Sequence, residues 1–255
     1  MRLFSRRVLT ASVAREQITA LSDFDGGLMR PDKCSEVEPI KTPFDPADIS
    51  NPIQWLAKPH GEFFYRKGRP VHVSGAMWNL TRSPAARFPS PIFANYWTGE
   101  FDGPWAARVG ISKIEDFVSE MFRVTASDFG LLTSEVDLQA KNRAAGTFSY
   151  EGMSLVSGVP GLYWTNFFSK ELAEWLGLHD FPKELATSNG LAGGGLVLKF
   201  CESSDECRNI EVLQRQRAAI EWLGPEKFFD IHFPGRKAST PDWSKMPLQH
   251  LESTR

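Results

Sequence analysis

The histidines are the first residues to consider for metal binding or acid–base chemistry. No two of the five lie four residues apart, the spacing at which two imidazoles on one helical turn can share a metal ion; they are His60, His72, His179, His232 and His250. His60-Gly61-Glu62 comes nearest to a ligand pair, but an isolated His–Glu pair is more often a surface contact. We therefore expect no bound metal and no cofactor.

A catalytic nucleophile would need a base within reach, and the sequence offers no pattern that supplies one. The nucleophile elbow Gly-x-Ser-x-Gly is absent, and Ser74-Gly75 and Ser157-Gly158 are only fragments of it. Cys207 is expected in the first turn of a helix, where the helix dipole could lower its pKa. A buried, unreactive thiol remains the simpler interpretation for it and for Cys201.

Residues 190–195 read Gly-Leu-Ala-Gly-Gly-Gly and invite comparison with a phosphate-binding loop. In such loops the glycines follow a strand and open a helix, so that amides at the helix start face the phosphate. Here they precede a strand expected at Gly195–Cys201, and no Gly-Lys-Ser/Thr follows. The run predicts a flexible or bulged strand entry instead.

Because the sequence lacks metal-ligand spacing, a nucleophile elbow and a phosphate-binding loop, it predicts a binding protein with no catalytic residues. The alternative kept open is a hydrolase-like enzyme that uses scattered side chains such as His60, Glu62 and His72. A third possibility is binding of carbohydrate or nucleic acid through exposed tryptophans, of which nucleic acid is the weakest version because the net charge is −2.

Composition is that of a globular protein with its own core. The chain has 255 residues, 42% of them hydrophobic and 24% charged, and no apolar run approaches the roughly 20 residues of a membrane span. The N-terminus lacks the apolar segment of a secretory signal, and three cysteines fit free thiols in a reducing compartment. We expect a cytoplasmic protein that contacts no membrane.

Charge is distributed unevenly along the chain. Residues 55–90 hold six Lys/Arg and one acid, residues 98–137 hold three and eight, and residues 169–211 hold four and eight. The plain interpretation is solvated faces that cancel after folding. The other interpretation is that the two acidic stretches form a surface for a basic partner.

The order of elements predicts an α+β domain with a mixed or antiparallel sheet covered by helices. Strands are expected at Glu62–Tyr65, Val71–Trp78, Phe129–Thr133, Leu162–Phe168, Gly195–Cys201 and Phe228–Phe233. Helices are expected after the capping boxes Ser112–Glu115 and Ser203–Glu206 and after Ser169. The first carries one apolar stripe: Ile114, Phe117, Val118, Met121 and Phe122.

Both ends of the chain look irregular. Residues 1–59 contain Asp25-Gly26-Gly27 and several prolines, and we expect an irregular strap packed on a single domain of residues 60–255. The tail from Pro234 is also expected to be irregular.

Residues 96–105 form the most distinctive candidate for a binding surface. They read Tyr-Trp-Thr-Gly-Glu-Phe-Asp-Gly-Pro-Trp, with four aromatics and two acids and no regular period. Aromatics on loops are frequent interface anchors. The alternative is that they fold back and fill the core.

Three parts of the chain together resemble the immunity protein 52 family. They are the run Val159-Pro160-Gly161-Leu162-Tyr163-Trp164-Thr165-Asn166-Phe167-Phe168 with its capped helix, the segment from Phe129 to Glu135, and the strand Gly195–Cys201 with the helix after it. The resemblance covers about residues 60–235. It implies an antitoxin of a polymorphic toxin system, which binds and neutralises a cognate secreted toxin in the bacterial cytoplasm. The implied toxin is a nuclease effector of a type VI secretion system, often with a restriction-endonuclease-like fold.

No binding residue can be transferred through this resemblance, because interfaces in such families differ from pair to pair. A nuclease active site holds a polyanion, so an acidic surface could occupy it and be steered towards it. We therefore nominate acids and neighbouring aromatics as toxin-binding candidates: Trp97, Glu100, Asp102, Trp105, Glu135, Asp137, Asp205 and Glu206. For Asp205 and Glu206 the alternative is a local interaction with the helix dipole.

Overall fold

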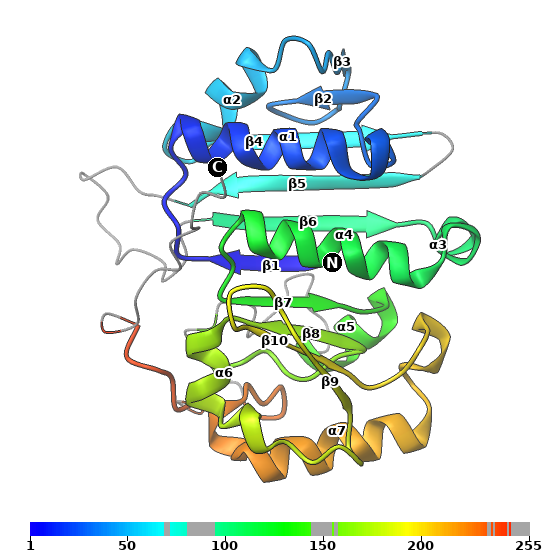
Figure 1. The fold of residues 1–255 in the computed structure, drawn as a ribbon, viewed down its shortest axis with the longest axis vertical. Helices are drawn as coiled ribbons and strands as arrows, with labels where there is room; N and C mark the ends of the chain where they lie inside the picture. The colour runs from blue at the N-terminus through cyan, green and yellow to red at the C-terminus, as the bar shows by residue number, and fades with distance from the viewer. Residues whose placement is uncertain are drawn as a thin grey trace. The chain divides into compact units, whose positions relative to one another are not determined.

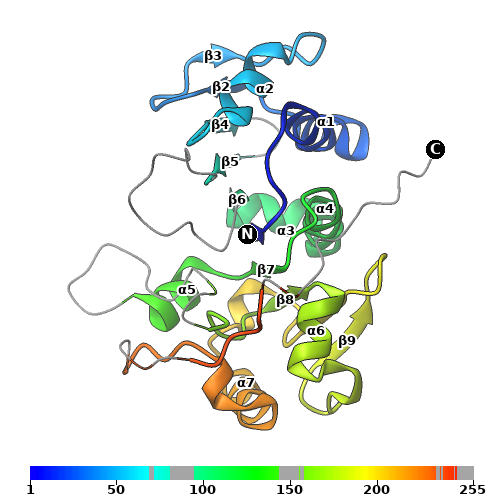
Figure 2. The same cartoon turned by 90° about the vertical axis from the view of Figure 1, so that its left-hand side faces the viewer.

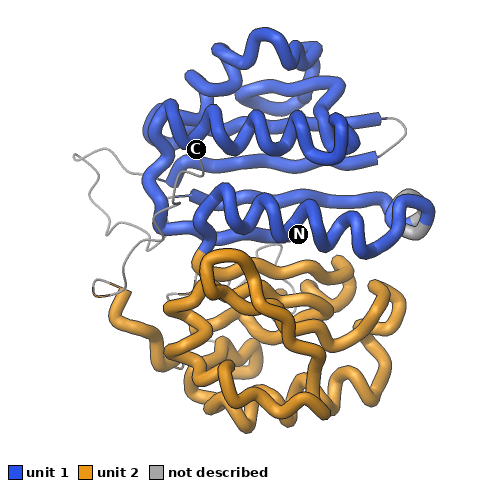
Figure 3. Tube along the Cα trace, in the orientation of Figure 1, with its two compact units in different colours: residues 1–127, 248–255 blue, residues 128–247 orange. Residues whose placement is uncertain are grey.

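The computed structural model describes residues 1–68, 72–80, 95–143, 155, 158–233, 236, 238–243 and 245, and only the backbone of residues 104, 105 and 107. The chain divides into two compact units, Met1–Ser127 and Asp128–Pro247 (Figure 3). The division expected from the sequence was a strap of residues 1–59 and one domain of residues 60–255. Each unit is described by itself.

Unit 1 is built on an antiparallel sheet in the order β3-β2-β4-β5-β6-β1. The strands are β1 Arg2–Ser5, β2 Lys33–Ser35, β3 Thr42–Pro43, β4 Glu62–Lys67, β5 Val73–Asn79 and β6 Asn95–Phe101. The predicted strands at Glu62–Tyr65 and Val71–Trp78 correspond to β4 and β5. The predicted binding loop is largely β6, whose residues alternate between the two faces of the sheet.

Helices α1 Ala11–Gly27 and α4 Ile111–Val124 lie on the same face of this sheet (Figures 1 and 2), and α2 Ser50–Ala57 and α3 Gly103–Val109 complete the unit. The predicted stripe of α4 is buried in full: Ile114, Phe117, Val118, Met121 and Phe122. The predicted capping box is wrong, because α4 begins after Gly110 and no side chain caps it. Apolar periodicity, and not the cap, places this helix.

The N-terminal 59 residues are structured, contrary to the irregular strap predicted for them. They form β1, α1, β2, β3 and α2, and β1 pairs with β6 so that Leu3 lies opposite Trp97. The Thr10 side chain caps α1 by accepting from the amide of Val13 at 3.3 Å. The turn signal at Asp25-Gly26-Gly27 marks the end of α1, where the backbone takes positive φ angles of 46° at Asp25 and 68° at Gly26.

Unit 2 contains antiparallel strands in the order β7-β8-β10-β9. Its elements are β7 Phe129–Leu132, α5 Glu135–Asn142, β8 Thr165–Phe168, α6 Lys170–Leu176, β9 Thr187–Gly190, β10 Leu196–Lys199 and α7 Ile210–Leu223, with short 3-10 turns at Leu178–Asp180, Ser204–Glu206 and Pro225–Lys227. Helices α5 and α6 lie on opposite faces of the strands (Figures 1 and 2). All residues of β7 and β8 are buried, as expected for strands covered on both sides.

Local signals in unit 2 are confirmed at one helix and wrong at another. Ser169 caps α6 through the amide of Leu172 at 3.2 Å, and Gly177 ends the helix in the left-handed conformation with φ 83°. By contrast, the helix predicted to open at Ser203 begins at Ile210, because residues 204–206 form a separate 3-10 turn.

The C-terminal part of the chain departs from expectation in one further place. The strand predicted at Phe228–Phe233 is not formed, and Phe228 makes a single parallel bridge to Val159 before the chain turns. The glycine run of residues 190–195 connects β9 to β10, as the prediction of a strand entry required. The predicted tail lies mostly outside the described residues. Antiparallel strands with packed helices in both units confirm the predicted α+β class.

Candidate functional site

Trp97, predicted as an interface anchor, is a core residue of unit 1. Its side chain is 0% exposed, and its indole Nε1 donates to the Tyr65 hydroxyl at 2.8 Å. The rings of Tyr65 and Phe117 meet it edge to face. Trp97 therefore fills the core, the alternative that the sequence left open, because its side chain lies on the face of β6 that the helices cover. The side chain of Trp105 lies outside the described residues.

Glu100 and Asp102 are exposed, and they line a cavity of about 570 Å³ in unit 1. The amide of Asp102 donates to the His72 carbonyl at 3.0 Å, which holds the end of β6 beside the start of β5. The ionisable lining is mixed: Asp32, Glu100 and Asp102 face Lys33, Arg66 and Lys67. This cavity is therefore charged but balanced, and it is not the purely acidic surface that was predicted.

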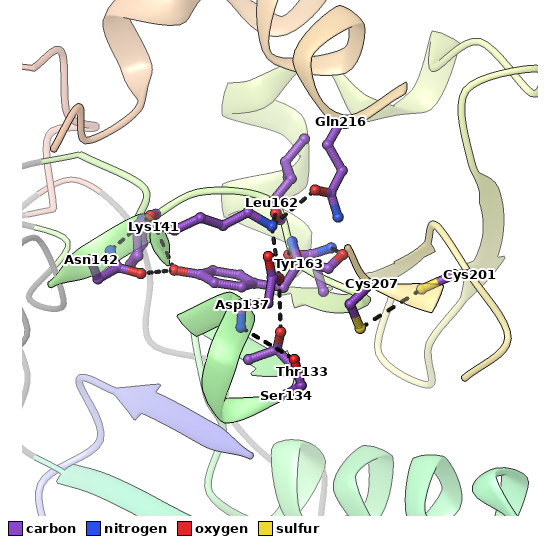
Figure 4. Close-up of polar contacts among 12 residues, drawn as sticks. Thr133, Ser134, Asp137, Lys141, Asn142, Leu162, Tyr163, Cys201, Cys207 and Gln216 are labelled. Atoms are coloured by element: carbon purple, nitrogen blue, oxygen red, sulfur yellow. Dashed lines mark hydrogen bonds and ion pairs between the residues drawn. The ribbon is translucent and has the colours of Figure 1, made fainter. Parts of the chain in front are cut away.

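Asp137 is the second nominated residue that proves to be buried. Its side chain is 0% exposed and Oδ2 accepts from Lys141 Nζ at 2.8 Å and from Thr133 Oγ1 at 2.9 Å. Ser134 caps the same helix by accepting from the Asp137 amide at 3.2 Å (Figure 4). Asp137 cannot contact a toxin in this conformation, because its carboxylate is directed into the protein and paired there.

Lys141 is the centre of this polar cluster. Besides Asp137, its ammonium donates to the Leu162 carbonyl at 2.7 Å and to Gln216 Oε1 at 2.9 Å, and it lies 4.9 Å from the centre of the Tyr163 ring (Figure 4). Burial lowers the pKa of Lys141, and the nearby Asp137 carboxylate opposes that shift. One charged group thus joins α5, the segment before β8, and α7.

A second set of hydrogen bonds extends the cluster. The Tyr163 hydroxyl donates to Asn142 Oδ1 and to the Pro160 carbonyl, and Asn142 Nδ2 donates to that same carbonyl at 3.0 Å. Asn166 accepts from the Tyr163 amide at 2.9 Å. The Gly-Leu-Tyr-Trp run is therefore fixed by polar contacts as well as by its apolar side chains.

The remaining nominated acids of unit 2 are brought together by Cys207. The backbone of Ser134 lowers the pKa of the Cys207 thiol, so Glu135 and Glu206, each next to one of these two residues, belong to the same neighbourhood. Glu135 and Asp205 are exposed, and Glu206 is half-buried. We call Glu135, Asp205 and Glu206 the acidic edge.

The acidic edge makes contacts with neighbouring residues of its own segments. Glu135 accepts from Gln139 at 2.9 Å, and Glu206 accepts from the amide of Glu202 at 3.0 Å. Asp205 accepts from the Ser204 hydroxyl at 3.4 Å.

The two cysteines beside the acidic edge are buried free thiols, with their sulfur atoms 4.0 Å apart. The hydrogen bond from Cys201 lowers the pKa of Cys207, while that bond and burial raise the pKa of Cys201. Cys207 is 0% exposed, so no reagent in solution reaches it in this conformation.

The residues of the enzyme alternative are not brought together. Glu62 pairs with Trp78 at one end of the β4–β5 ladder, whereas His72 precedes Val73, which pairs with Lys67 at the other end. Five residue steps along a strand separate these ends by roughly 17 Å. Within the described part of the chain there is no group of three or more His, Cys, Asp or Glu side chains that could hold a metal ion.

Sequence reasoning missed Lys141 and Gln216. The spacing of Asp137 and Lys141, four residues apart on one helix, was a signal for an ion pair, but it could not show that the pair is buried. Nothing in the sequence indicated Gln216, because its contact with Lys141 joins residues 75 positions apart.

Comparisons with known proteins give one result at the level of fold. No protein-family model matches the chain, and no curated protein matches it. The resemblance to the immunity protein 52 family therefore stays a prediction. A solved structure, the T6SS protein PA0821 of Pseudomonas aeruginosa, is similar in fold with a TM-score of 0.55 and 10% sequence identity. The match covers 86% of this chain and 72% of that one.

None of the helices in the described ranges combines the length and the apolar character needed to cross a bilayer.

Proposed function

We propose that this chain is an immunity protein that binds and neutralises a toxin of a type VI secretion system. The observation that carries the proposal is the fold shared, over 86% of the chain, with a protein described as part of that system. The resemblance of the Gly-Leu-Tyr-Trp run and its neighbouring elements to the immunity protein 52 family supports the same role. In this proposal the chain meets its toxin in the cytoplasm.

The acidic edge is the surface we propose for the toxin. Asp205 and Glu135 are exposed and come from segments 70 positions apart in sequence, which approach each other where the Ser134 backbone lies near the Cys207 thiol. If the toxin is a nuclease, its active site is built for a polyanion, and carboxylates held in place could occupy it. Glu100 and Asp102 form a second, weaker candidate, because cations share their cavity.

The direct test is co-expression with the product of the neighbouring gene. We expect the two proteins to co-purify and the chain to restore growth of cells that express that product. If the pair neither co-purifies nor restores growth, the proposed function is wrong.

The double variant Glu135→Lys with Asp205→Lys tests the surface. It should weaken binding about 10- to 100-fold, mainly through slower association and with a reduced dependence on salt. The matched control is Glu184→Lys, an exposed acid of unit 2 outside the acidic edge, which should bind as the wild type does. If the wild type, the double variant and the control bind the toxin equally well, the acidic edge is not the interface.

A further inference from the structure

Unit 2 contains a cavity of about 630 Å³ that the proposed toxin surface does not use. One wall is a single face of α7, formed by Leu213, Gln216, Arg217 and Ile220. The opposite walls are α5, with the segment of residues 160–162, and residues 225–232. A volume of this size is typical of small-molecule sites.

The polar floor of the cavity is incompletely satisfied. Gln216 is 3% exposed and Asp137 is 0% exposed, and both line the cavity. Gln216 Nε2 and Asp137 Oδ1 have no hydrogen-bond partner in the described structure. The ammonium of Lys141 beside them has three N–H donors, and these are paired with acceptors on Asp137, Leu162 and Gln216. Buried polar atoms without partners are uncommon in folded proteins and point to a missing partner.

The mouth of the cavity carries an excess of positive charge. Arg208 and Arg217 are exposed, and neither has an ion pair or hydrogen bond among the described residues. Arg236 is held by the Pro225 carbonyl at 3.0 Å and lies 3.9 Å from Asp230. The three arginines outnumber the two acids that line the cavity with them, Glu221 and Asp230. Asp137 does not change this balance, because it is already paired with Lys141.

The walls between floor and mouth are apolar, with Leu162, Leu213, Ile220, Phe229 and Ile231 among the lining residues. A planar guanidinium binds a carboxylate or phosphate through two parallel hydrogen bonds, and apolar walls favour a carbon skeleton. We propose that this cavity binds a small organic anion, with a phosphate or carboxylate held by Arg208 and Arg217 and an apolar body between α7 and residues 228–231.

Calorimetric titration with three probes tests this site on the full chain: phenyl phosphate, phenylacetate and inorganic phosphate. Phenyl phosphate or phenylacetate should bind with a Kd of about 1 mM or tighter. Inorganic phosphate should bind at least about tenfold more weakly, because it lacks the apolar body. The stronger of the two aromatic probes identifies the anionic group.

The variant Arg208→Ala with Arg217→Ala should weaken binding of the aromatic anion by about tenfold or more. Lys183→Ala, an exposed cation of unit 2 away from the lining, should bind as the wild type does. Circular dichroism of both variants checks that they are folded.

Three results would overturn the proposal: no binding of either aromatic anion, equal binding of inorganic phosphate, or unchanged affinity in the arginine variant. Modification of Arg217 by an arginine-specific dicarbonyl reagent tests a different occupant. If the toxin complex protects Arg217 from the reagent and the aromatic anions do not bind, the cavity receives a protein segment instead. The three overturning results use no toxin and do not depend on the acidic edge, so the site and the proposed function fail separately.

Discussion

Trp97 in unit 1 and Asp137 in unit 2 are both 0% exposed, yet they are held by different kinds of contact. Trp97 lies among aromatic rings and makes one hydrogen bond, to Tyr65. Asp137 is paired with a charged lysine that has two further acceptors. The first core gains free energy from buried apolar area, and the second depends on specific polar partners.

This difference predicts how each core responds to damage. An aromatic core loses burial and packing when a ring is removed, in proportion to the volume lost. A buried ion pair is costly to break on one side, because the remaining charge stays in a poorly solvated place, but it can be cheap to replace as a whole. Substitutions at the centre of each core can therefore separate the two kinds of stabilisation.

Trp97→Ala should give the largest effect, a loss of about 3–5 kcal/mol in the free energy of unfolding, because it removes a fully buried ring and leaves a cavity. Urea unfolding followed by circular dichroism measures the loss. The matched control is Trp78→Ala on the neighbouring strand, where the ring is half-buried and stacks on Tyr96 at 5.2 Å. Equal losses in the two variants would show that Trp97 is not the centre of this core.

Asp137→Ala should cost about 3 kcal/mol, since Lys141 would keep its buried charge without a carboxylate. The lower end of the usual range applies because the Lys141 side chain is 21% exposed. The double variant Asp137→Leu with Lys141→Met should recover at least half of that loss. A double variant less stable than the single one would show that the hydrogen bonds of Lys141 to Leu162 and Gln216 outweigh the ion pair.

Much of the fold could be predicted from the sequence, because it is encoded in local periodicity. The stripe of α4, the cap and left-handed end of α6 at Ser169 and Gly177, and the fully buried strands β7 and β8 follow from patterns within a few residues. The prediction for the N-terminal segment was wrong, because its turn residues suggested irregular structure. The spacing of Val13, Ile18 and Leu21, which α1 buries, was the signal for a helix.

The candidate site was less predictable, because burial depends on partners distant in sequence. Trp97 and Asp137 were nominated as surface residues, and only the pairing of β6 with β1 and β5, and of α5 with α7, shows that they are interior. The neighbourhood of Glu135 and Glu206 likewise arises from a contact across more than 70 residues. Sequence could identify the acids and aromatics but not which of them reach the surface.

The two cores should also respond to alkali with opposite signs. Burial lowers the pKa of Lys141 from 10.5, so between its folded value and 10.5 the unfolded chain binds more protons, and stability rises with pH. Burial raises the pKa of Tyr65 from 10.0, against a smaller opposing effect of the hydrogen bond from Trp97. Its contribution is therefore complete below pH 10 and is lost as pH rises further.

Urea unfolding of wild type, Lys141→Met and Tyr65→Phe from pH 7 to pH 11 separates these contributions. The wild type should gain stability relative to Lys141→Met as pH rises towards 10.5, by at most about 1.4 kcal/mol per pH unit, the limit for one proton. Relative to Tyr65→Phe it should stay constant to pH 10 and then lose stability. If the wild type instead gains no stability below pH 10.5 and loses it above that pH relative to Lys141→Met, the attraction of Asp137 outweighs desolvation, and the pKa of Lys141 is raised by the fold as that of Tyr65 is.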